Sequence, residues 1–197
     1  MRSDIRAICA SACLAITIMM TPASSQSQTS NVTETFDAKS LSEWGHVGDA
    51  NWTLVDDVMQ ANKGNGFLVT KNKYSDFYLK AEFWVDEKAN SGIFIRCQDQ
   101  QKPGTQSGYE VNIFDERPEP AYGTGAIVGV AKVDPMPKAG GKWNVMEVTA
   151  KGSQFTIVLN GQVTVRLAED SRFPSGYIGL QYGAGMVKFR KIEINRL

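Results

Sequence analysis

The sequence has few of the residues from which metal centres and disulfide frameworks are built. It contains one histidine, His46, which excludes any site that needs two or three histidines. Two of its three cysteines, Cys9 and Cys13, lie in the first apolar run, so Cys97 has no partner for an internal disulfide once that run is removed. Lys and Arg together number 21, and so do Asp and Glu. Because this chain lacks the basic excess that nucleic-acid binding requires, we expect no nucleic-acid partner.

The first 25 residues have the parts of a secretory signal peptide. Two arginines precede an apolar run over residues 7–20, which is short for a membrane span. Ala23 and Ser25 are small, as positions −3 and −1 of a cleavage site should be. We expect residues 1–25 to be removed, leaving a secreted or periplasmic protein with no membrane span. A membrane anchor is the alternative.

The remaining chain is expected to be one domain behind a short leader. Residues 26–34 are rich in Ser, Gln and Thr, which is typical of a flexible segment. We expect residues from Gln26 to about Thr35 to lie outside the compact fold. Residues 35–197 have ordinary globular composition and the length of a single domain.

The domain is predicted to be all-β, because apolar residues recur at every second position and never at a sustained helical spacing. The expected strands are 77–85, 93–98, 109–115, 143–151, 155–160, 163–167, 177–181 and 187–195. Asn160-Gly161 is a strong hairpin turn, and Lys151-Gly152-Ser153 is a second one. Strands at this density favour a sandwich of two antiparallel sheets. The residues expected in its core are Trp143, Val145, Phe155, Ile157, Leu159, Ile178 and Leu180.

Two of the expected strands, 93–98 and 109–115, carry polar residues on one face. Successive side chains of a strand point to opposite faces. If the apolar set (Ile93, Ile95, Cys97, Tyr109, Val111 and Ile113) is buried, the other set (Phe94, Arg96, Gln98, Glu110, Asn112 and Phe114) points away from the core. If the strands are neighbours, these groups share one surface, which Tyr78, Glu82 and Trp84 would extend. Rings with charged and amide groups suit a sugar. A solvated face with cross-strand ion pairs is the alternative.

The same residues belong to a series of motifs with a recognisable order. The series comprises Phe36-Asp-Ala-Lys-Ser-Leu-Ser-Glu-Trp44, Asn90-Ser-Gly-Ile-Phe-Ile-Arg96, Gly108-Tyr-Glu-Val-Asn-Ile-Phe-Asp115, Leu159-Asn-Gly161 and Gly176-Tyr-Ile-Gly-Leu-Gln181. Over about residues 34–197 it resembles the 3-keto-disaccharide hydrolase domain family. The resemblance implies a concanavalin A-like lectin/glucanase sandwich of jelly-roll type, export, and action on oxidised sugars at the concave sheet face. It places Arg96, Glu110 and Asp115 at matching family positions.

The chain departs from this family at two positions. Asn112 stands where the family often has Gln, and Tyr182 to Gly185, after Gln181, contain no histidine where the family often has one. If that histidine ligates a metal or moves a proton in relatives, this chain lacks it.

A keto group near the glycosidic bond makes the adjacent hydrogen acidic, so a base can form an enolate that expels the aglycone. Glu110 is the candidate base, Arg96 the enolate stabiliser, and Asp115 a second acid/base or a metal ligand. Glu110 and Asp115 would lie about 16–17 Å apart on a regular strand, too far for an ordinary glycosidase pair. Glu82 could supply a partner carboxylate. In the alternative interpretation, Arg96 and Glu110 form a structural ion pair.

We therefore predict a glycoside hydrolase-like protein that acts on keto-glycosides or disaccharides. The predicted sugar-binding residues are Tyr78, Trp84, Gln98, Asn112 and Gln181. No cofactor is expected, and a divalent metal stays an open alternative. The rival functions are a non-catalytic carbohydrate-binding module and a lectin-like domain that binds a protein partner. Convergence of Arg96, Glu110 and Asp115 in one pocket would favour catalysis.

Overall fold

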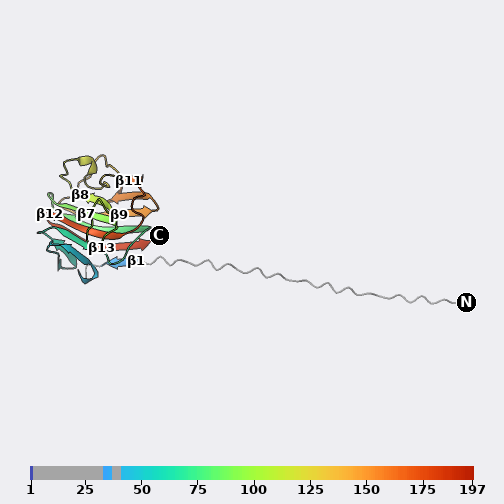
Figure 1. The fold of residues 1–197 in the computed structure, drawn as a ribbon. Helices are drawn as coiled ribbons and strands as arrows, with labels where there is room; N and C mark the ends of the chain where they lie inside the picture. Colours follow the sequence, from blue (N-terminus) through green and yellow to red (C-terminus); the bar gives the residue numbers. More distant parts are fainter. Residues whose placement is uncertain (2–32, 37–40) are drawn as a thin grey trace. The chain divides into compact units, whose positions relative to one another are not determined.

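The computed structural model describes residue 1, residues 33–36 and residues 41–197. Apart from residue 1, the predicted signal peptide lies outside the described residues, as does most of the leader. The described chain forms two antiparallel sheets (Figure 1), which confirms the expected all-β sandwich. Among the described residues, no helix is long and apolar enough to cross a membrane.

The larger sheet has eight strands, in the order β11-β10-β9-β6-β13-β4-β3, with β1 also paired to β13. Its strands are β1 (Thr33–Phe36), β3 (Thr53–Val55), β4 (Val58–Ala61), β6 (Phe77–Val85), β9 (Trp143–Lys151), β10 (Gln154–Leu159), β11 (Gln162–Glu169) and β13 (Val187–Arg196). The smaller sheet has five strands, in the order β2-β5-β12-β7-β8. These are β2 (Gly45–Gly48), β5 (Gly66–Val69), β7 (Asn90–Cys97), β8 (Tyr109–Ile113) and β12 (Tyr177–Ala184). Two short 3-10 turns, Leu41–Glu43 and Pro120–Tyr122, lie in the connections.

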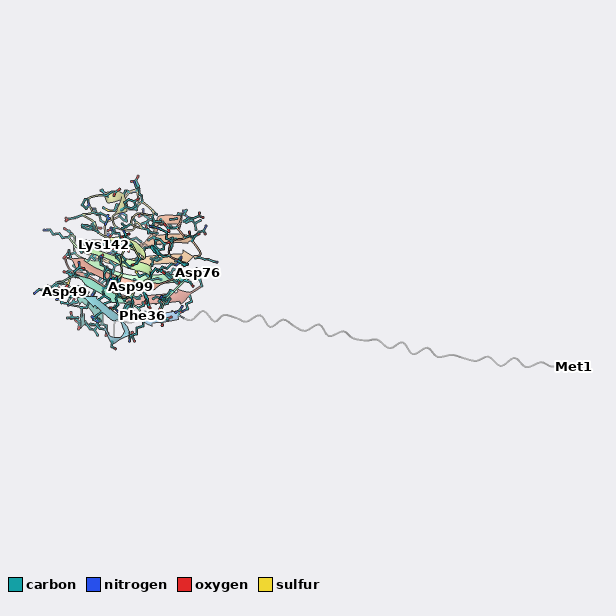
Figure 2. The ribbon with its side chains drawn as sticks, in the orientation of Figure 1. Met1, Phe36, Asp49, Asp76, Asp99 and Lys142 are labelled. Carbon is teal, nitrogen blue, oxygen red and sulfur yellow. The ribbon has the colours of Figure 1, made fainter. Side chains whose placement is uncertain are left out.

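The alternating sequences form strands because each buries one set of side chains between the sheets. In β6, Phe77, Leu79 and Phe83 are fully buried, while Tyr78 and Trp84 are only half-buried. Figure 2 draws the side chains of the described residues on the ribbon. The Asn160-Gly161 turn joins β10 to β11 as predicted. Asn160 has φ 52° and Gly161 has φ 79°, and this pair of positive angles is why Asn-Gly suits a two-residue hairpin.

The predicted core is correct except on β9. Phe155, Ile157, Leu159, Ile178 and Leu180 are all buried. Trp143, however, is 38% exposed, and Val145 is half-buried, so the predicted inward face of β9 was wrong.

The opposite face of β9 is buried because of a polar anchor at its start. Asn144 donates two hydrogen bonds, to Ala139 O (2.9 Å) and Lys142 O (2.8 Å), and accepts one from Asn160 (2.9 Å). Because side chains of a strand alternate between faces, the buried position of Asn144 places Met146, Val148 and Ala150 in the core as well.

The compact fold also begins earlier than predicted. Thr33 and Glu34 pair with Asn195 and Ile194 on β13, so the last residues of the expected flexible leader form a strand. Glu34 fixes this strand because it accepts a hydrogen bond from Tyr74 (2.6 Å) and pairs with Arg196 (3.0 Å).

Leu180 gives a direct test of the buried face of β12. It has no exposed surface, so Leu180→Ala should lower the free energy of unfolding by about 2–5 kcal/mol through lost burial and a residual cavity. Urea unfolding measures this change. Val163→Ala, at a position 38% exposed, should change it by less than about 0.5 kcal/mol. Equal effects of the two variants would contradict the assigned core.

Candidate functional site

The outer face of the five-stranded sheet brings together part of the predicted site. β7 and β8 are neighbours, as expected, and Phe94 pairs with Glu110 across them. In the adjacent row Gly92 lies between Asn112 on β8 and Gln181 on β12. Directly paired residues of antiparallel strands project from the same face. Phe94, Glu110, Asn112 and Gln181 therefore share one surface.

Gly92 has no side chain, and the Glu110 carboxyl group takes up its place on this surface; we call this position the hollow. A Cβ atom at Gly92 would lie 3.3 Å from both Cγ and Oε1 of Glu110, so the Glu110 carboxyl group lies over the glycine. Any larger residue would displace the carboxyl group. Gly92 is not among the site residues predicted from the sequence, because this close approach depends on strand pairing that a sequence does not show.

Glu110 is the charged group of this hollow. It is 8% exposed, and burial raises its pKa to about 7 although the positive charge of Arg117 opposes the shift. No described residue donates a hydrogen bond to its carboxylate. A carboxyl group with a pKa near neutrality can both accept and return a proton, which is the property of a general base.

Two amide oxygens beside Glu110 are buried without a hydrogen-bond partner. They are Oδ1 of Asn112 and Oε1 of Gln181. The Asn112 amide nitrogen is held by Tyr122 O at 2.7 Å, which fixes the orientation of the side chain. Buried polar atoms without partners are rare, and these oxygens would be satisfied by hydroxyl groups of a bound sugar. Both residues lie on the same face as Glu110, and their role in sugar binding stays a prediction.

Oxygen atoms of this kind are also the ligands that hard divalent cations prefer. Glu110, Asn112 and Gln181 are the residues that could supply them here. In the described part of the chain, no three His, Cys, Asp or Glu side chains gather closely enough to hold a metal ion.

An aromatic wall borders the hollow. The rings of Phe67 and Phe94 pack edge to face with centroids 5.1 Å apart, and Phe67 is only half-buried. Pro103, from the loop after β7, lies near Gly179, which pairs with Phe94. The Pro103 Cβ atom would be 3.8 Å from a Cβ atom built on Gly179. Apolar ring surface next to unpaired oxygens matches the two-sided chemistry of a sugar.

The long Pro- and Gly-rich segment 116–141 positions the β8 side of the site. Its backbone pairs with β8: Val128 N donates to Glu110 O (3.0 Å), and Asn112 N donates to Ala126 O (3.0 Å). This segment also carries Arg117, which is half-buried and makes no hydrogen bond or ion pair with any described residue. Arg117 is not among the residues predicted from the sequence, because its position beside Glu110 depends on how this segment packs against β8.

Arg96 does not face Glu110, so the predicted juxtaposition is wrong. The register of β7 against β12 shifts between the Phe94 and Cys97 pairs, and Arg96 has φ 54°. This bulge reverses the alternation. The guanidinium group therefore donates to Ser75 O (2.8 Å) and Gly152 O (2.7 Å), pairs with Asp76 (3.2 Å), and has no exposed surface. Arg96 ties the two sheets together.

Asp115 also lies outside the hollow. It accepts hydrogen bonds from Thr124 Oγ1 (2.6 Å) and from the backbone N–H groups of Ala139 and Gly140 (both 2.9 Å). These bonds fix the two ends of segment 116–141 to each other. Arg96, Glu110 and Asp115 therefore do not converge in one pocket, which counts against catalysis by these three residues together, and only Glu110 lies in the hollow.

Three predicted sugar-binding residues are placed elsewhere as well. Tyr78 and Trp84 lie on β6, in the eight-stranded sheet, and so on the outer face of the other layer. Tyr78 donates to Glu147, and the Nζ atom of Lys188 lies 4.9 Å from the centre of the Trp84 ring. Gln98 donates to the backbone oxygens of Arg96 and Ser175. Alternation along the strand correctly predicted that Tyr78 and Trp84 point away from the core. It does not reveal which sheet a strand joins.

The remaining reactive residues have no part in this surface. His46 is exposed on β2, an edge strand. Cys97 is fully buried, and burial raises the pKa of its thiol to about 12, so it is not a nucleophile. Its sulfur lies under the following loop, 2.9 Å from where a Cβ atom of Gly108 would be.

The comparisons with known proteins agree with this architecture. Residues 31–195 match the model of the 3-keto-alpha-glucoside-1,2-lyase-like domain. The chain belongs to this family. The match confirms the resemblance found in the sequence motifs and indicates a carbohydrate-related, hydrolase-like domain. Among the curated proteins, none matches this chain.

Solved structures share the sandwich fold. A provisionally named glycosyl hydrolase from Parabacteroides distasonis is 26% identical, with a TM-score of 0.67, over 83% of this chain and 100% of that one. The carbohydrate-binding module CBM66 from Bacillus subtilis is 20% identical, with a TM-score of 0.63, over 78% and 95% of the two chains. A Bacillus subtilis protein with a galectin-like fold is 11% identical, with a TM-score of 0.63, over 83% and 94%.

Proposed function

We propose that this family member cleaves 3-keto-glycosides by removing the proton next to the keto group, with Glu110 as the base. The observation that carries the proposal is the environment of Glu110. Its carboxyl group has a pKa of about 7 and lies over Gly92, between residues whose amide oxygens have no partner. The family match supports a keto-glycoside as the substrate, and the composition of residues 1–25 supports action after export.

The proposed steps balance without an added oxidant or reductant. Glu110 takes the proton from C2 of a 3-keto sugar, and the C–H electron pair forms an enolate. The enolate expels the C1 oxygen of the aglycone, which takes the proton from Glu110 and leaves a C1–C2 double bond. Water then adds across this bond, with its hydroxyl group going to C1 and its proton to C2. This route needs one base and a cation near the enolate oxygen, and it needs no second carboxylate at a fixed separation.

Arg117 replaces Arg96 as the proposed enolate-stabilising group. Its charge acts on Glu110, and its guanidinium group has no partner among the described residues. An unpaired guanidinium group can pair with a negatively charged oxygen of the substrate.

Sugar binding without catalysis is the second candidate. The aromatic wall and the two unpartnered amide oxygens would hold a sugar whether or not Glu110 moves a proton. The two functions are separated by incubating the protein with a 3-keto-disaccharide and with its non-oxidised parent. Release of the aglycone from the keto-sugar alone supports the proposed lyase-type route. Binding of either sugar without release supports the binding module.

The pH dependence of the reaction follows from the raised pKa of Glu110. Below pH 7 the base is increasingly protonated, so kcat/KM should fall about tenfold per pH unit. The folded state also holds this proton at pH values where an ordinary carboxyl group, with a pKa of 4.5, has lost it. The free energy of unfolding should therefore fall as pH rises from about 4.5 to 7.

Rate profiles and urea unfolding at several pH values measure these two effects. Comparison with Glu110→Gln isolates the contribution of this group, because the variant has nothing to titrate at that position. A wild-type profile that stays flat between pH 5 and 8 would show that Glu110 is not the titrating base.

A further inference from the structure

The outer face of the eight-stranded sheet carries a second group of side chains suited to a ligand. Trp84 on β6 pairs directly with Trp143 on β9 and with Lys188 on β13. The Cζ atom of Arg190, also on β13, lies 3.9 Å from the centre of the Trp143 ring. We call Trp84, Trp143, Lys188 and Arg190 the tryptophan surface.

A bulge increases the positive charge of this surface. The pairing of β13 with β6 shifts between Arg190 and Ile192, and Lys191 has φ 47°. As a result, two successive basic residues reach the same carboxylate: Arg190 lies 2.7 Å and Lys191 3.4 Å from the oxygens of Glu82.

Glu82 is ionised and does not balance these charges. Partial burial would raise its pKa, but the hydrogen bond from Arg190 and the charges of Arg190 and Lys191 outweigh burial and lower it. Around the two tryptophans there is thus one carboxylate for three cations: Arg190 and Lys191 pair with Glu82, and Lys188 lies over Trp84. The tryptophan surface keeps an excess of positive charge.

Each indole ring has a cation over it, Lys188 on Trp84 and Arg190 on Trp143, so a ligand would contact the part of each ring that stays exposed. Trp143 is 38% exposed, and Trp84 is half-buried. Neither indole N–H donates a hydrogen bond to another described residue. A structural cation–π pair explains the Arg190 contact, but it does not explain an exposed tryptophan next to a second one.

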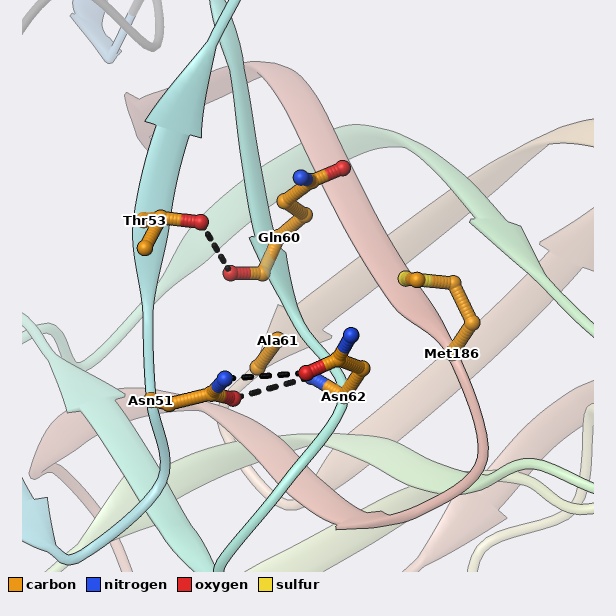
Figure 3. A pocket seen from close by; sticks show the side chains of 6 residues that line it. All are labelled: Asn51, Thr53, Gln60, Ala61, Asn62 and Met186. Atoms are coloured by element: carbon orange, nitrogen blue, oxygen red, sulfur yellow. Dashed lines mark hydrogen bonds between the residues drawn. The ribbon is translucent and has the colours of Figure 1, made fainter.

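Polar groups continue the same row across the sheet. Beyond Lys188, the directly paired residues are Gln60 on β4 and Thr53 on β3. They line a small hollow with Asn51, Asn62 and Met186, in which Asn51 and Asn62 are bonded to each other (Figure 3). The Gln60 amide takes part in none of the hydrogen bonds drawn there. At about 4.8 Å between strands, the row from Thr53 to Trp143 is about 19 Å long.

We propose that the tryptophan surface and the adjoining hollow bind an acidic oligosaccharide, one whose sugar rings carry carboxylate groups. Indole rings stack on the C–H faces of sugars, and guanidinium and ammonium groups pair with carboxylates. The amide of Gln60 and the hydroxyl of Thr53 suit sugar hydroxyls. The excess positive charge selects an acidic sugar over a neutral one. This site is independent of Glu110, which lies on the outer face of the other sheet.

Titration of the full chain with tetragalacturonate, followed by tryptophan fluorescence and calorimetry, tests the proposal. Cellotetraose serves as the neutral probe. We expect tetragalacturonate to bind with an affinity that falls as salt is raised, and cellotetraose to bind at least about tenfold more weakly. Trp143→Ala and Lys188→Gln should each weaken tetragalacturonate binding about tenfold.

The matched control for Lys188→Gln is Lys80→Gln, which removes the same charge from the same face of the sheet but from β6. Lys80 pairs with Glu147 and Glu193, away from the two tryptophans, so its loss should leave the affinity unchanged. Glu110→Gln should also leave it unchanged, which separates this proposal from the function of the hollow over Gly92.

Three results would overturn the proposal. They are equal affinity for the two probes, equal loss of affinity in Lys80→Gln and Lys188→Gln, and no binding by a folded wild-type chain. Analytical sedimentation tests the alternative that a second copy of the chain covers this face. Self-association that Trp143→Ala abolishes, in a chain that binds neither sugar, would support that alternative.

Discussion

Glu110→Gln is expected to lower the turnover of a 3-keto-glycoside by about 10²–10⁴, the usual contribution of a general base. The substitution keeps the size and planarity of the side chain over Gly92, so the hollow should keep its shape. Affinity for the keto-sugar should stay within a few-fold of wild type, since the amide oxygens of Asn112 and Gln181 remain. Single-turnover kinetics and a separate binding titration measure the two quantities.

Glu147→Gln is the matched control for this prediction. Glu147 lies on β9 of the other sheet, where it accepts a hydrogen bond from Tyr78. The Glu147→Gln variant should therefore turn over the keto-glycoside at the wild-type rate. If Glu110→Gln and Glu147→Gln both turn over the keto-glycoside at the wild-type rate, another residue supplies the base.

Arg96→Ala is expected to lower the free energy of unfolding by about 3 kcal/mol. Removing one partner of a buried ion pair costs about 3–5 kcal/mol, and the lower end applies because the Asp76 side chain is 36% exposed and can be rehydrated. The loss includes the hydrogen bonds to Ser75 O and Gly152 O and the packing of the guanidinium group on Phe155, 5.2 Å from the ring centre. Urea unfolding measures the change.

Arg172→Ala is the control for Arg96→Ala, because it removes an arginine that is exposed and not buried. The side chain of Arg172 is 54% exposed and pairs with Asp170 at 2.7 Å, so its loss should cost no more than about 1 kcal/mol. Arg96→Ala should retain activity at temperatures where it remains folded. A variant as stable as wild type but without turnover would instead place Arg96 in the reaction.

Much of the fold could be predicted because strand periodicity is a local property. The ranges predicted for β6 and β9 match the structure, and the Asn160-Gly161 turn has the expected positive φ angles. The five strands before residue 77 were not predicted. They are three or four residues long, too short for alternation to distinguish them from loops.

The site was predicted only in part because it depends on non-local pairing. The neighbouring positions of Phe94, Glu110 and Asn112 followed correctly from parity. Parity failed at Arg96, where a bulge turns the side chain toward the core, and it could not show that β6 belongs to the other sheet. The role of Gly92 became visible only when the strand carrying Glu110 was placed beside it.

The central claim, proton removal by Glu110, is tested most directly by carrying out the reaction in deuterium oxide. The released sugar is analysed by NMR early in the reaction, with a sample lacking enzyme as the control for spontaneous exchange. If the C2 proton is removed and replaced from solvent, the product formed by wild type carries deuterium at C2. In Glu110→Gln the rate of deuterium incorporation should fall in proportion to the rate of turnover. A released sugar that retains its original hydrogen at C2 would contradict the account, because the glycosidic bond would then have broken without an enolate.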